Sequence, residues 1–379
     1  MKRLKYGMVG GGLGAYIGCC HRQGARMDDM CELVAGCFSR SMEKNKNTAE
    51  AWNLPDMNRI YSDYKEMAEC ESKRDDRIDF VTIATPNNSH FEIAKCFMEH
   101  GFNVMCDKPL TTTTEEAKEL QRIAHEKQVV FGLTYTYTGY AVIRQAREMI
   151  RSGAIGDIIH VRVAHPEDWV IESISPQPGE ALPWRLNPDI AGNSLCTADL
   201  GLHAEQMLVQ FTGLHVKRVL AMLDTYPRYV PLETNSTVLL DLGDGVTGEL
   251  WASQIAVGTA CEPSIYVIGS KGALQWDHAA PGVLKYSKLG QPIQYLEAGR
   301  SYMCSESLRI TRVDTQHHEG YYEAFGNIYR SYAEVLMAKM EGREADGFTF
   351  PTIDDGVMGM RFVEACLESQ KNGNVWVEL

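Results

Sequence analysis

Two groups of side chains in this chain have the types and spacing suited to proton and hydride chemistry. Asp199 and His203 stand four residues apart, so a helix would place both on one face. A histidine can take a proton from a hydroxyl group near neutral pH, and a carboxylate can orient it. Lys108 follows an apolar run, and its ammonium group would stabilise a developing alkoxide. A surface pair for Asp199 and His203, and a solvated lysine at a strand end, are the plainer interpretations.

The element that would position a cofactor beside Lys108 lies at the start of the chain. Residues 4–18, LKYGMVGGGLGAYIG, predict a short strand, a glycine turn and a helix. Gly10 permits a tight turn, and Gly12 lets a pyrophosphate approach the backbone. Leu13 and Gly14 are counted with them as cofactor-binding candidates, because the N–H groups that begin a helix attract phosphate. The spacing departs from the strict fingerprint, and such turns also occur for structural reasons alone.

The next hundred residues predict a parallel, doubly wound sheet. The apolar run at 78–84 lacks alternation, as a strand covered on both faces would, and further strands are predicted at 32–38 and 103–106, with helical stretches between them. Ligands of such sheets bind beyond the carboxyl ends of the strands. Polar residues follow three of these runs: Ser39 and Arg40; Thr85, Pro86 and Asn87; Asp107 and Lys108. We therefore predict a Rossmann dinucleotide-binding domain over residues 1–135.

Residues 136–379 are expected to form a second, α+β domain for substrate binding and oligomerisation. Alternating strands dominate after residue 158, which predicts a large, mostly antiparallel open sheet. Gly-Asp-Gly at 243–245 and Ser-Lys-Gly at 270–272 predict hairpin turns. Long helices are predicted at 192–211, 321–340 and 354–371, and the first of these carries Asp199 and His203.

Several aromatic residues have two interpretations. Tyr135, Tyr137 and Tyr140 suit ordinary core packing, but a tyrosine also offers a sugar both a flat face and a hydroxyl group. Trp184 and Arg185, in a proline-rich loop, have the same two interpretations.

No metal site is predicted. His317 and His318 are adjacent, so their side chains point apart on any regular element. His165, Glu167 and Asp168 are expected to be solvated loop residues.

Composition narrows the class of protein. The chain has 379 residues, of which 44% are hydrophobic, a formal net charge of −13 and no basic run. This argues against nucleic acid or an anionic membrane as a partner. No stretch reaches the length of a membrane span, and no cleavable signal is expected. Eleven cysteines without a CxxC pair, several within apolar segments, suggest buried thiols and a cytoplasmic location.

Together these motifs resemble the glucose–fructose oxidoreductase / myo-inositol dehydrogenase (Gfo/Idh/MocA) family. The matching segments span nearly the whole chain in family order: GMVGGGLGAYIG, ATPNNSH, CDKPL, SGAIGD, PWR, DLGLH and HEGYYEAFGNIYRSYAE. The resemblance implies a Rossmann domain, a nicotinamide cofactor, and a C-terminal sheet that commonly forms the oligomer interface.

The resemblance also implies roles for individual residues. Lys108 would contact the reacting hydroxyl, and His203 would act as the acid/base beside Asp199. Thr85, Pro86, Asn87, His90 and Asp107 would line the cofactor, and Trp184 and Arg185 would lie near the nicotinamide. Tyr135 and Tyr137 are carried as substrate-binding candidates. Asp107 stands where the family usually has glutamate.

The choice between NAD(H) and NADP(H) rests on Ser39 and Arg40. An NAD-selective site usually ends its second strand with an acidic residue, which is absent here. Ser39 and Arg40 suit the 2′-phosphate of NADP, although Arg40 stacked on adenine would also accept NAD.

The predicted activity is hydride transfer between nicotinamide and a secondary hydroxyl of a sugar, glycoside or inositol. The narrower hypothesis is oxidation at C3 of a glycoside, with a tightly bound cofactor that is recycled in place. The protein is expected to be a homo-oligomer. Two alternatives stay open: a glycoside-cleaving enzyme of the same fold that oxidises its substrate transiently, and a non-catalytic cofactor sensor.

Overall fold

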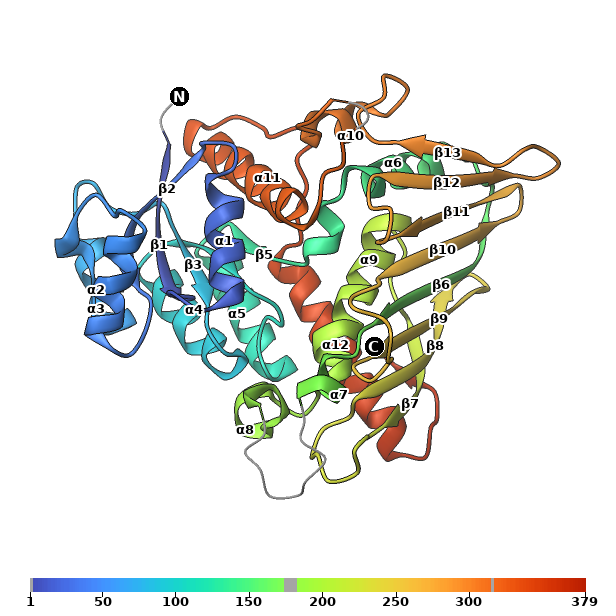
Figure 1. The fold of residues 1–379 in the computed structure, drawn as a ribbon, viewed down its shortest axis with the longest axis horizontal. Helices are drawn as coiled ribbons and strands as arrows, with labels where there is room; N and C mark the ends of the chain where they lie inside the picture. Colours follow the sequence, from blue (N-terminus) through green and yellow to red (C-terminus); the bar gives the residue numbers. More distant parts are fainter. Residues whose placement is uncertain (1–2, 174–182, 315–316) are drawn as a thin grey trace. The chain divides into compact units, whose positions relative to one another are not determined.

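The apolar runs of the N-terminal third form one parallel sheet. In the computed structural model, which describes residues 3–173, 183–314 and 317–379, its strand order is β2-β1-β3-β4-β5 (Figure 1). Every residue of β3 (Phe80–Ala84) is buried, as expected for a strand covered on both faces. The predicted doubly wound architecture is confirmed.

The chain divides into two compact units, each built from two stretches. The first contains Met1–Gly139 and Tyr321–Val357, and the second contains Tyr140–Gly320 and Met358–Leu379. These units are defined by contacts, and the functional domains expected over residues 1–135 and 136–379 stay a prediction.

The elements of the first unit follow in chain order. They are β1 (Leu4–Gly10), α1 (Tyr16–Arg26), β2 (Cys31–Cys37), α2 (Met42–Ala51), η1 (Met57–Arg59), α3 (Tyr64–Ser72), β3, η2 (Asn87–Ser89), α4 (His90–Glu99), β4 (Asn103–Cys106), α5 (Thr114–Glu126), β5 (Phe131–Leu133), η3 (Thr136–Gly139), α11 (Tyr321–Glu341) and the start of α12 (Ile353–Lys371).

Helix α11 completes the core of the first unit although it comes late in the sequence. Its Tyr329 and Tyr332 are fully buried against Phe80, on the face of the sheet that α1 also covers. A Cβ atom on Gly24 of α1 would lie 2.9 Å from the ring of Phe325. The close packing of α1 on α11 therefore requires glycine at this position.

The elements of the second unit are α6 (Ala141–Arg151), β6 (Ile158–Pro166), α7 (Trp169–Ser173), η4 (Trp184–Leu186), α8 (Pro188–Ala191), η5 (Thr197–Gly201), α9 (Leu202–Thr212), β7 (Arg218–Asp224), β8 (Asn235–Gly243), β9 (Val246–Ser253), β10 (Ser264–Gly269), β11 (Gly272–Asp277), β12 (Val283–Lys288), β13 (Gln294–Glu297), α10 (Ser305–Ile310), the rest of α12, and β14 (Val377–Glu378).

The strands of the second unit form one sheet in the order β13-β12-β11-β10-β6-β9-β8-β7-β14. All neighbours pair antiparallel except β6 and β9, which are parallel. Asp244 and Gly245 join β8 to β9 with positive φ angles of 51° and 79°, as the predicted hairpin requires. The predicted mostly antiparallel sheet is confirmed.

One predicted helix starts later than expected. The helix is expected to begin at Gly192, but Gly192 has a φ angle of 91° and ends α8. The helix begins instead near the π-helical turn η5, and α9 continues it. Hydrogen bonds from residues 194, 195 and 197 to the buried Glu233 hold this segment, which does not form a regular first helical turn.

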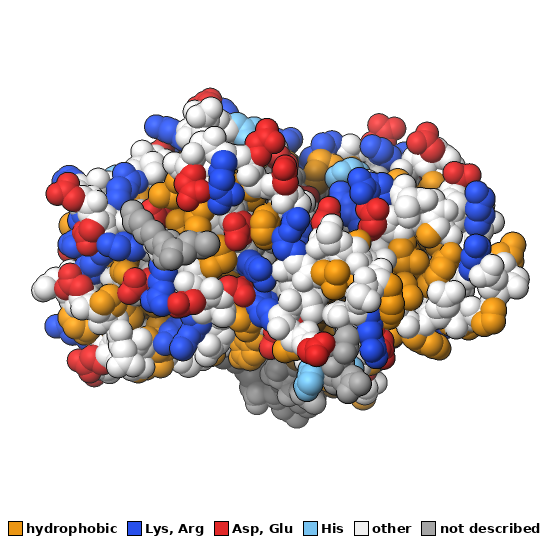
Figure 2. Space-filling model, turned by 90° about the horizontal axis from the view of Figure 1, so that it is seen from above, with side chains coloured by type: hydrophobic (Ala, Val, Ile, Leu, Met, Phe, Trp, Pro, Cys, Tyr) orange, Lys and Arg blue, Asp and Glu red, His pale blue; other side chains and the backbone are white. Residues whose placement is uncertain are grey.

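One face of the nine-stranded sheet carries exposed apolar side chains. Strand β8 alternates buried and exposed residues, and α9 packs against β6 and β10. Exposed hydrophobic residues occur along β6 to β10: Ile159, Met222, Leu239, Trp251 and Tyr266. Hydrophobic side chains also gather on the surface at the right of Figure 2. Within the described parts of the chain, no helix combines the length and apolar character needed to cross a membrane.

Candidate active site

The glycine turn after β1 brings the backbone close to its neighbours. Gly10 and Gly11 have φ angles of 77° and 67°, which favour glycine. A Cβ atom on Gly10 would lie 2.5 Å from the carbonyl oxygen of Ala84, and one on Gly12 would lie 3.0 Å from Thr48 Oγ1. The turn therefore excludes side chains at the edge where a dinucleotide would be expected.

The glycine that packs helix α1 against the turn is Gly18, the last residue of the segment 4–18. A Cβ atom there would lie 1.8 Å from the carbonyl oxygen of Gly11. Beyond its chain neighbours, no residue that the structure describes has an atom within 4 Å of a Cβ placed on Gly14, whose φ angle is 86°, so its role is conformational. Leu13 is 55% exposed, and its N–H donates to Thr48 Oγ1 at 3.2 Å.

The other cofactor candidates of the first unit lie at the same edge, because the strands are parallel. Ser39 and Arg40 follow β2, and Arg40 is exposed. Thr85 and Pro86 follow β3, and Asn87 begins η2. The structure thus brings together residues that are separated in sequence, as the strand-end pattern predicts.

His90 joins two of these strand ends. Its Nδ1 lies 2.7 Å from the carbonyl oxygen of Pro109, and its Nε2 lies 2.9 Å from that of Thr85. The ring is fully buried. Carbonyl oxygens only accept hydrogen bonds, so each ring nitrogen faces an acceptor. The two contacts connect the segment that carries Lys108 to the residues that follow β3.

Asp107 and the half-buried Lys108 directly follow β4. The hydroxyl group of Thr134 donates to Asp107 Oδ1 at 2.8 Å. His21 Nε2 lies 3.9 Å from the same oxygen, and its Nδ1 lies 2.7 Å from the hydroxyl oxygen of Tyr329. A buried polar cluster therefore lies beneath the segment that carries the candidate lysine.

The tyrosines that follow β5 are buried. Tyr135 has no exposed surface, and Tyr137 is 6% exposed and stacks edge-on against Tyr321. Burial favours the packing interpretation for Tyr135. The substrate-binding role of either residue stays a prediction.

The second unit places Asp199 in η5 and His203 in α9. Asp199 Oδ2 accepts a hydrogen bond from Gln254 Nε2 at 3.0 Å, and Arg185 Nε lies 3.9 Å from the same oxygen. The Arg185 guanidinium also lies over the ring of Trp184, 4.6 Å from its centroid. Asp199 thus lies among groups that bind carboxylates or hydroxyls, and Gln254 is one that sequence reasoning missed.

The start of η5 is held by a buried carboxylate. Glu233 Oε1 accepts hydrogen bonds from the Ser194 hydroxyl at 2.5 Å and the Thr197 N–H at 3.0 Å, and Oε2 accepts from the Leu195 N–H at 3.2 Å. Burial raises the pKa of Glu233, and these hydrogen bonds act in the opposite direction. This anchor fixes the turn that carries Asp199.

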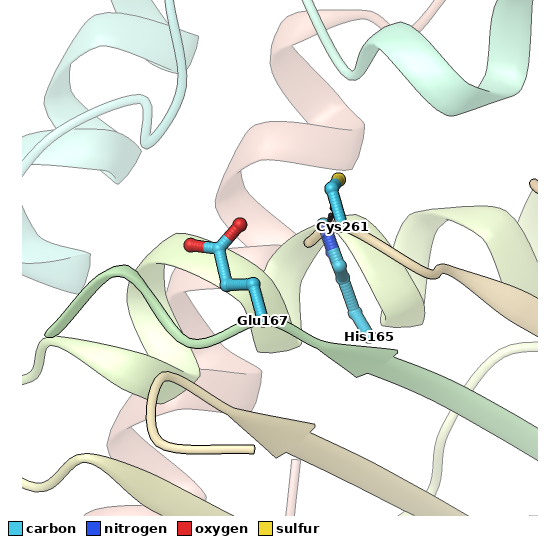
Figure 3. A group of neighbouring side chains, drawn as sticks. All are labelled: His165, Glu167 and Cys261. Atoms are coloured by element: carbon cyan, nitrogen blue, oxygen red, sulfur yellow. Dashed lines mark hydrogen bonds between the residues drawn. The ribbon is translucent and has the colours of Figure 1, made fainter. Parts of the chain in front are cut away.

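His165 and its neighbours differ from expectation. The sequence predicts a solvated loop, but His165 is a buried residue of β6, 1% exposed, and its ring centroid lies 5.6 Å from that of His203. The reason is strand alternation: Val161 and Val163 are buried on the same face, a signal that could have located His165. Glu167 and Cys261 lie beside it (Figure 3).

Lys108 belongs to the first unit, and Asp199 and His203 belong to the second. Their use in one reaction is therefore part of the proposal made below.

Comparison with known proteins finds a family match for each of two parts of the chain. Residues 4–135 match the family described as "Oxidoreductase family, NAD-binding Rossmann fold", and residues 143–275 match the "GFO/IDH/MocA C-terminal domain". An uncharacterized oxidoreductase, YfiI of Bacillus subtilis, is 35% identical over 100% of this chain and 97% of its own length.

Two further relatives have named ligands or substrates. The structure of an inositol dehydrogenase homolog from Azotobacter vinelandii, complexed with NADH and myo-inositol, is 34% identical with a TM-score of 0.92, and the match covers 100% of this chain and 98% of that one. Levoglucosan dehydrogenase of Pseudarthrobacter phenanthrenivorans is 32% identical over 46% of this chain and 43% of its own.

The chain therefore belongs to the GFO/IDH/MocA family of oxidoreductases, as its motifs predict, and its N-terminal part is an NAD-binding Rossmann fold.

The buried cluster beneath Lys108 predicts a pH-dependent stability. Burial lowers the pKa of His21 to about 4 from 6.5, although Asp107 acts in the opposite direction. Between these values the unfolded chain binds more protons, so the free energy of unfolding falls as the pH drops. We expect His21 to account for about 2 kcal/mol of the stability lost between pH 7 and pH 5.

Urea unfolding of His21→Gln at both pH values measures this contribution. The variant should lose less stability on acidification than the wild type, and the matched variant of the exposed His215, His215→Gln, should keep the wild-type dependence. Equal losses in wild type and His21→Gln would contradict the assignment.

Proposed function

We propose that this protein is an NAD(P)-dependent dehydrogenase that oxidises a secondary hydroxyl group of a sugar, glycoside or inositol. The observation that carries the proposal is Asp199, held by Gln254 and Arg185, in the turn directly before His203. The same chain carries Lys108 at the edge of an NAD-binding sheet. A cofactor sensor would need the glycine turn but not Lys108, Asp199 or His203.

When bound, the nicotinamide cofactor would supply the acceptor for the hydride of the carbinol carbon. The glycine turn and the backbone that follows it would hold the pyrophosphate, since they present N–H groups and exclude side chains. Thr85, Pro86 and Asn87 would line the cofactor at the neighbouring strand end.

Lys108 would bind the oxygen of the reacting hydroxyl. Its ammonium group stabilises negative charge that grows on this oxygen as the hydride leaves. The His90 contacts to the carbonyl oxygens of Pro109 and Thr85 limit movement of the segment, so the ammonium group is positioned before the substrate arrives.

His203 would take the hydroxyl proton, so that loss of a hydride and a proton leaves a ketone. The imidazole is 7% exposed and therefore largely shielded from water. Asp199 would accept hydrogen bonds from substrate hydroxyls, with Gln254 and Arg185 fixing its orientation. In the direction of reduction, His203 returns the proton.

Relatives support the substrate class. The Azotobacter homolog binds myo-inositol with NADH, and the Pseudarthrobacter relative is named for levoglucosan, an anhydrosugar. The narrower hypothesis within this class is that the enzyme oxidises C3 of a glycoside and recycles a tightly bound cofactor in place.

Substitution of the candidate catalytic residues tests the reaction. With NAD⁺ or NADP⁺ and a panel of myo-inositol, levoglucosan, D-xylose and an aryl glucoside, we expect His203→Ala to lower kcat by roughly 10²–10⁴-fold. Lys108→Ala should lower it by roughly 10²–10³-fold. Formation of reduced cofactor measures both effects.

The matched controls Lys118→Ala and His215→Ala remove exposed residues of the same types and should stay within about twofold of the wild type. If Lys108→Ala and His203→Ala also stay within about twofold of the wild type, the assigned roles are wrong.

Product analysis separates oxidation from cleavage. A keto sugar with an intact linkage is expected, and released aglycone would indicate the cleaving enzyme instead.

Arg40 tests the choice of cofactor. The exposed guanidinium at the end of β2 suits a 2′-phosphate. We expect Arg40→Ala to lower kcat/KM for NADP⁺ about 10-fold more than for NAD⁺, as loss of a charge-assisted hydrogen bond predicts. Equal losses with both cofactors would indicate stacking on adenine, and Arg26→Ala, another exposed arginine, serves as the control.

We also propose that the protein is a homo-oligomer through the open face of the nine-stranded sheet. Trp251 of β9 pairs with Thr237 of β8, and Thr237 pairs with Met222 of β7. The exposed apolar side chains of Trp251 and Met222 therefore lie in one row across three strands. We further propose that the protein is cytoplasmic, and buried thiols such as Cys106 support this location.

Light scattering tests the assembly. The wild type should have a mass of at least twice the chain mass of 42.4 kDa. Trp251→Glu should lower this mass, because it places a charge in the interface. Leu289→Glu, in an exposed turn after β12, should leave the mass unchanged. A monomeric wild type would overturn the proposal.

A further inference from the structure

Three side chains beside His203 have no part in the proposed reaction. His165, Glu167 and Cys261 offer an imidazole nitrogen, a carboxylate oxygen and a thiol sulfur, all within 4.8 Å of one another. In Figure 3 the Glu167 carboxylate and the Cys261 thiol project to the same side of the strands. His165 is buried, whereas Glu167 and Cys261 are half-buried, so the group is accessible from solvent.

Backbone hydrogen bonds bring the three residues together. The N–H of Glu262 donates to the carbonyl oxygen of Pro166 at 3.1 Å, which continues the pairing of β6 with β10 past the strand ends. Cys261 is thereby held opposite the end of β6. The N–H of Glu167 donates to the carbonyl oxygen of Ser253 at 2.7 Å, so the carboxylate also begins from a fixed backbone.

A second contact fixes the segment of Cys261. His278 Nδ1 donates to the Cys261 carbonyl oxygen at 3.1 Å, because that oxygen can only accept. The His278 Nε2 lies 3.0 Å from the hydroxyl oxygen of Tyr140 and accepts from it when the ring is neutral. The thiol is therefore presented by a supported segment, as a metal ligand requires.

His165 Nε2 and Cys261 Sγ are within hydrogen-bond distance of each other, and the same distance suits two ligands of one zinc ion. A tetrahedral zinc ion with bonds of about 2.05 Å to nitrogen and 2.3 Å to sulfur separates these two ligands by about 3.5 Å. His165 Nε2 and Cys261 Sγ lie 3.5 Å apart. The carboxylate oxygen of Glu167 lies within 4.8 Å of both atoms, and in the proposed site it would turn towards the ion.

We propose that His165, Glu167 and Cys261 bind a divalent transition metal ion of the zinc class. Imidazole and thiolate favour such ions over magnesium or calcium, which prefer oxygen ligands. The ion is an inhibitor rather than a cofactor of the reaction. This second step rests on the proposed function: the His165 ring lies 5.6 Å from that of His203, and a hydrated ion there crowds the approach of a substrate hydroxyl to His203.

Cobalt(II) measures the binding without any assay of activity. Titration of the full chain, kept reduced and freed of metal by chelator, should give one tight equivalent with the thiolate charge-transfer absorption and strong visible bands of tetrahedral cobalt. Zinc should displace it. We expect Cys261→Ser and His165→Gln each to weaken binding at least about 100-fold, more than loss of an outer-shell partner costs.

The controls separate this site from the other thiols. Cys70 is an exposed cysteine, so Cys70→Ser should bind cobalt as the wild type does, and circular dichroism checks that each variant is folded. Wild-type protein without the thiolate absorption would overturn the proposal. So would unchanged binding in both Cys261→Ser and His165→Gln, or equal loss in Cys70→Ser.

The inhibitory step has its own readout. Zinc should raise the KM for the polyol substrate in wild type and Cys70→Ser, with kcat retained and chelator restoring the original KM. Cys261→Ser should resist zinc. Zinc binding without this effect would overturn inhibition alone, and an absence of dehydrogenase activity, with the cobalt site intact, would count against the proposed function and not against the metal site.

Discussion

The first unit depends on how closely α1 approaches its two neighbours. At Gly18 a Cβ atom would lie 1.8 Å from the Gly11 carbonyl oxygen, and at Gly24 it would lie 2.9 Å from Phe325. The two contacts fix α1 between the glycine turn and α11. They also place His21, which lies between them in α1, in the buried cluster beneath Lys108. One packing requirement therefore sets both the dinucleotide turn and the support of the lysine.

A different constraint organises the second unit. Glu233 is a buried carboxylate whose desolvation opposes ionisation, and hydrogen bonds from Ser194, Leu195 and Thr197 offset this cost. These contacts replace the regular first turn of the helix predicted over 192–211. Asp199 is therefore positioned by buried polar contacts, and helical periodicity alone could not locate the start of its turn.

Much of the fold follows from local pattern. The unbroken apolar run at 78–84 predicts a strand covered on both faces, and its parallel neighbours then bring their polar ends to one edge. The place of α11 does not follow, because its aromatic face packs on α1 through contacts about 300 residues apart in sequence. Periodicity gives the helix and its apolar face but not the surface that the face covers.

The same limit explains which parts of the site were predicted. Lys108, Asp199 and His203 lie in short motifs, so residue type and spacing point to them. His165 and Cys261 are 96 residues apart and meet through the pairing of β6 with β10. The buried positions Val161 and Val163 predict the orientation of His165, but its partner is set by strand register. Sites assembled across a sheet therefore have to be derived from register, whereas sites at strand ends can be derived from motifs.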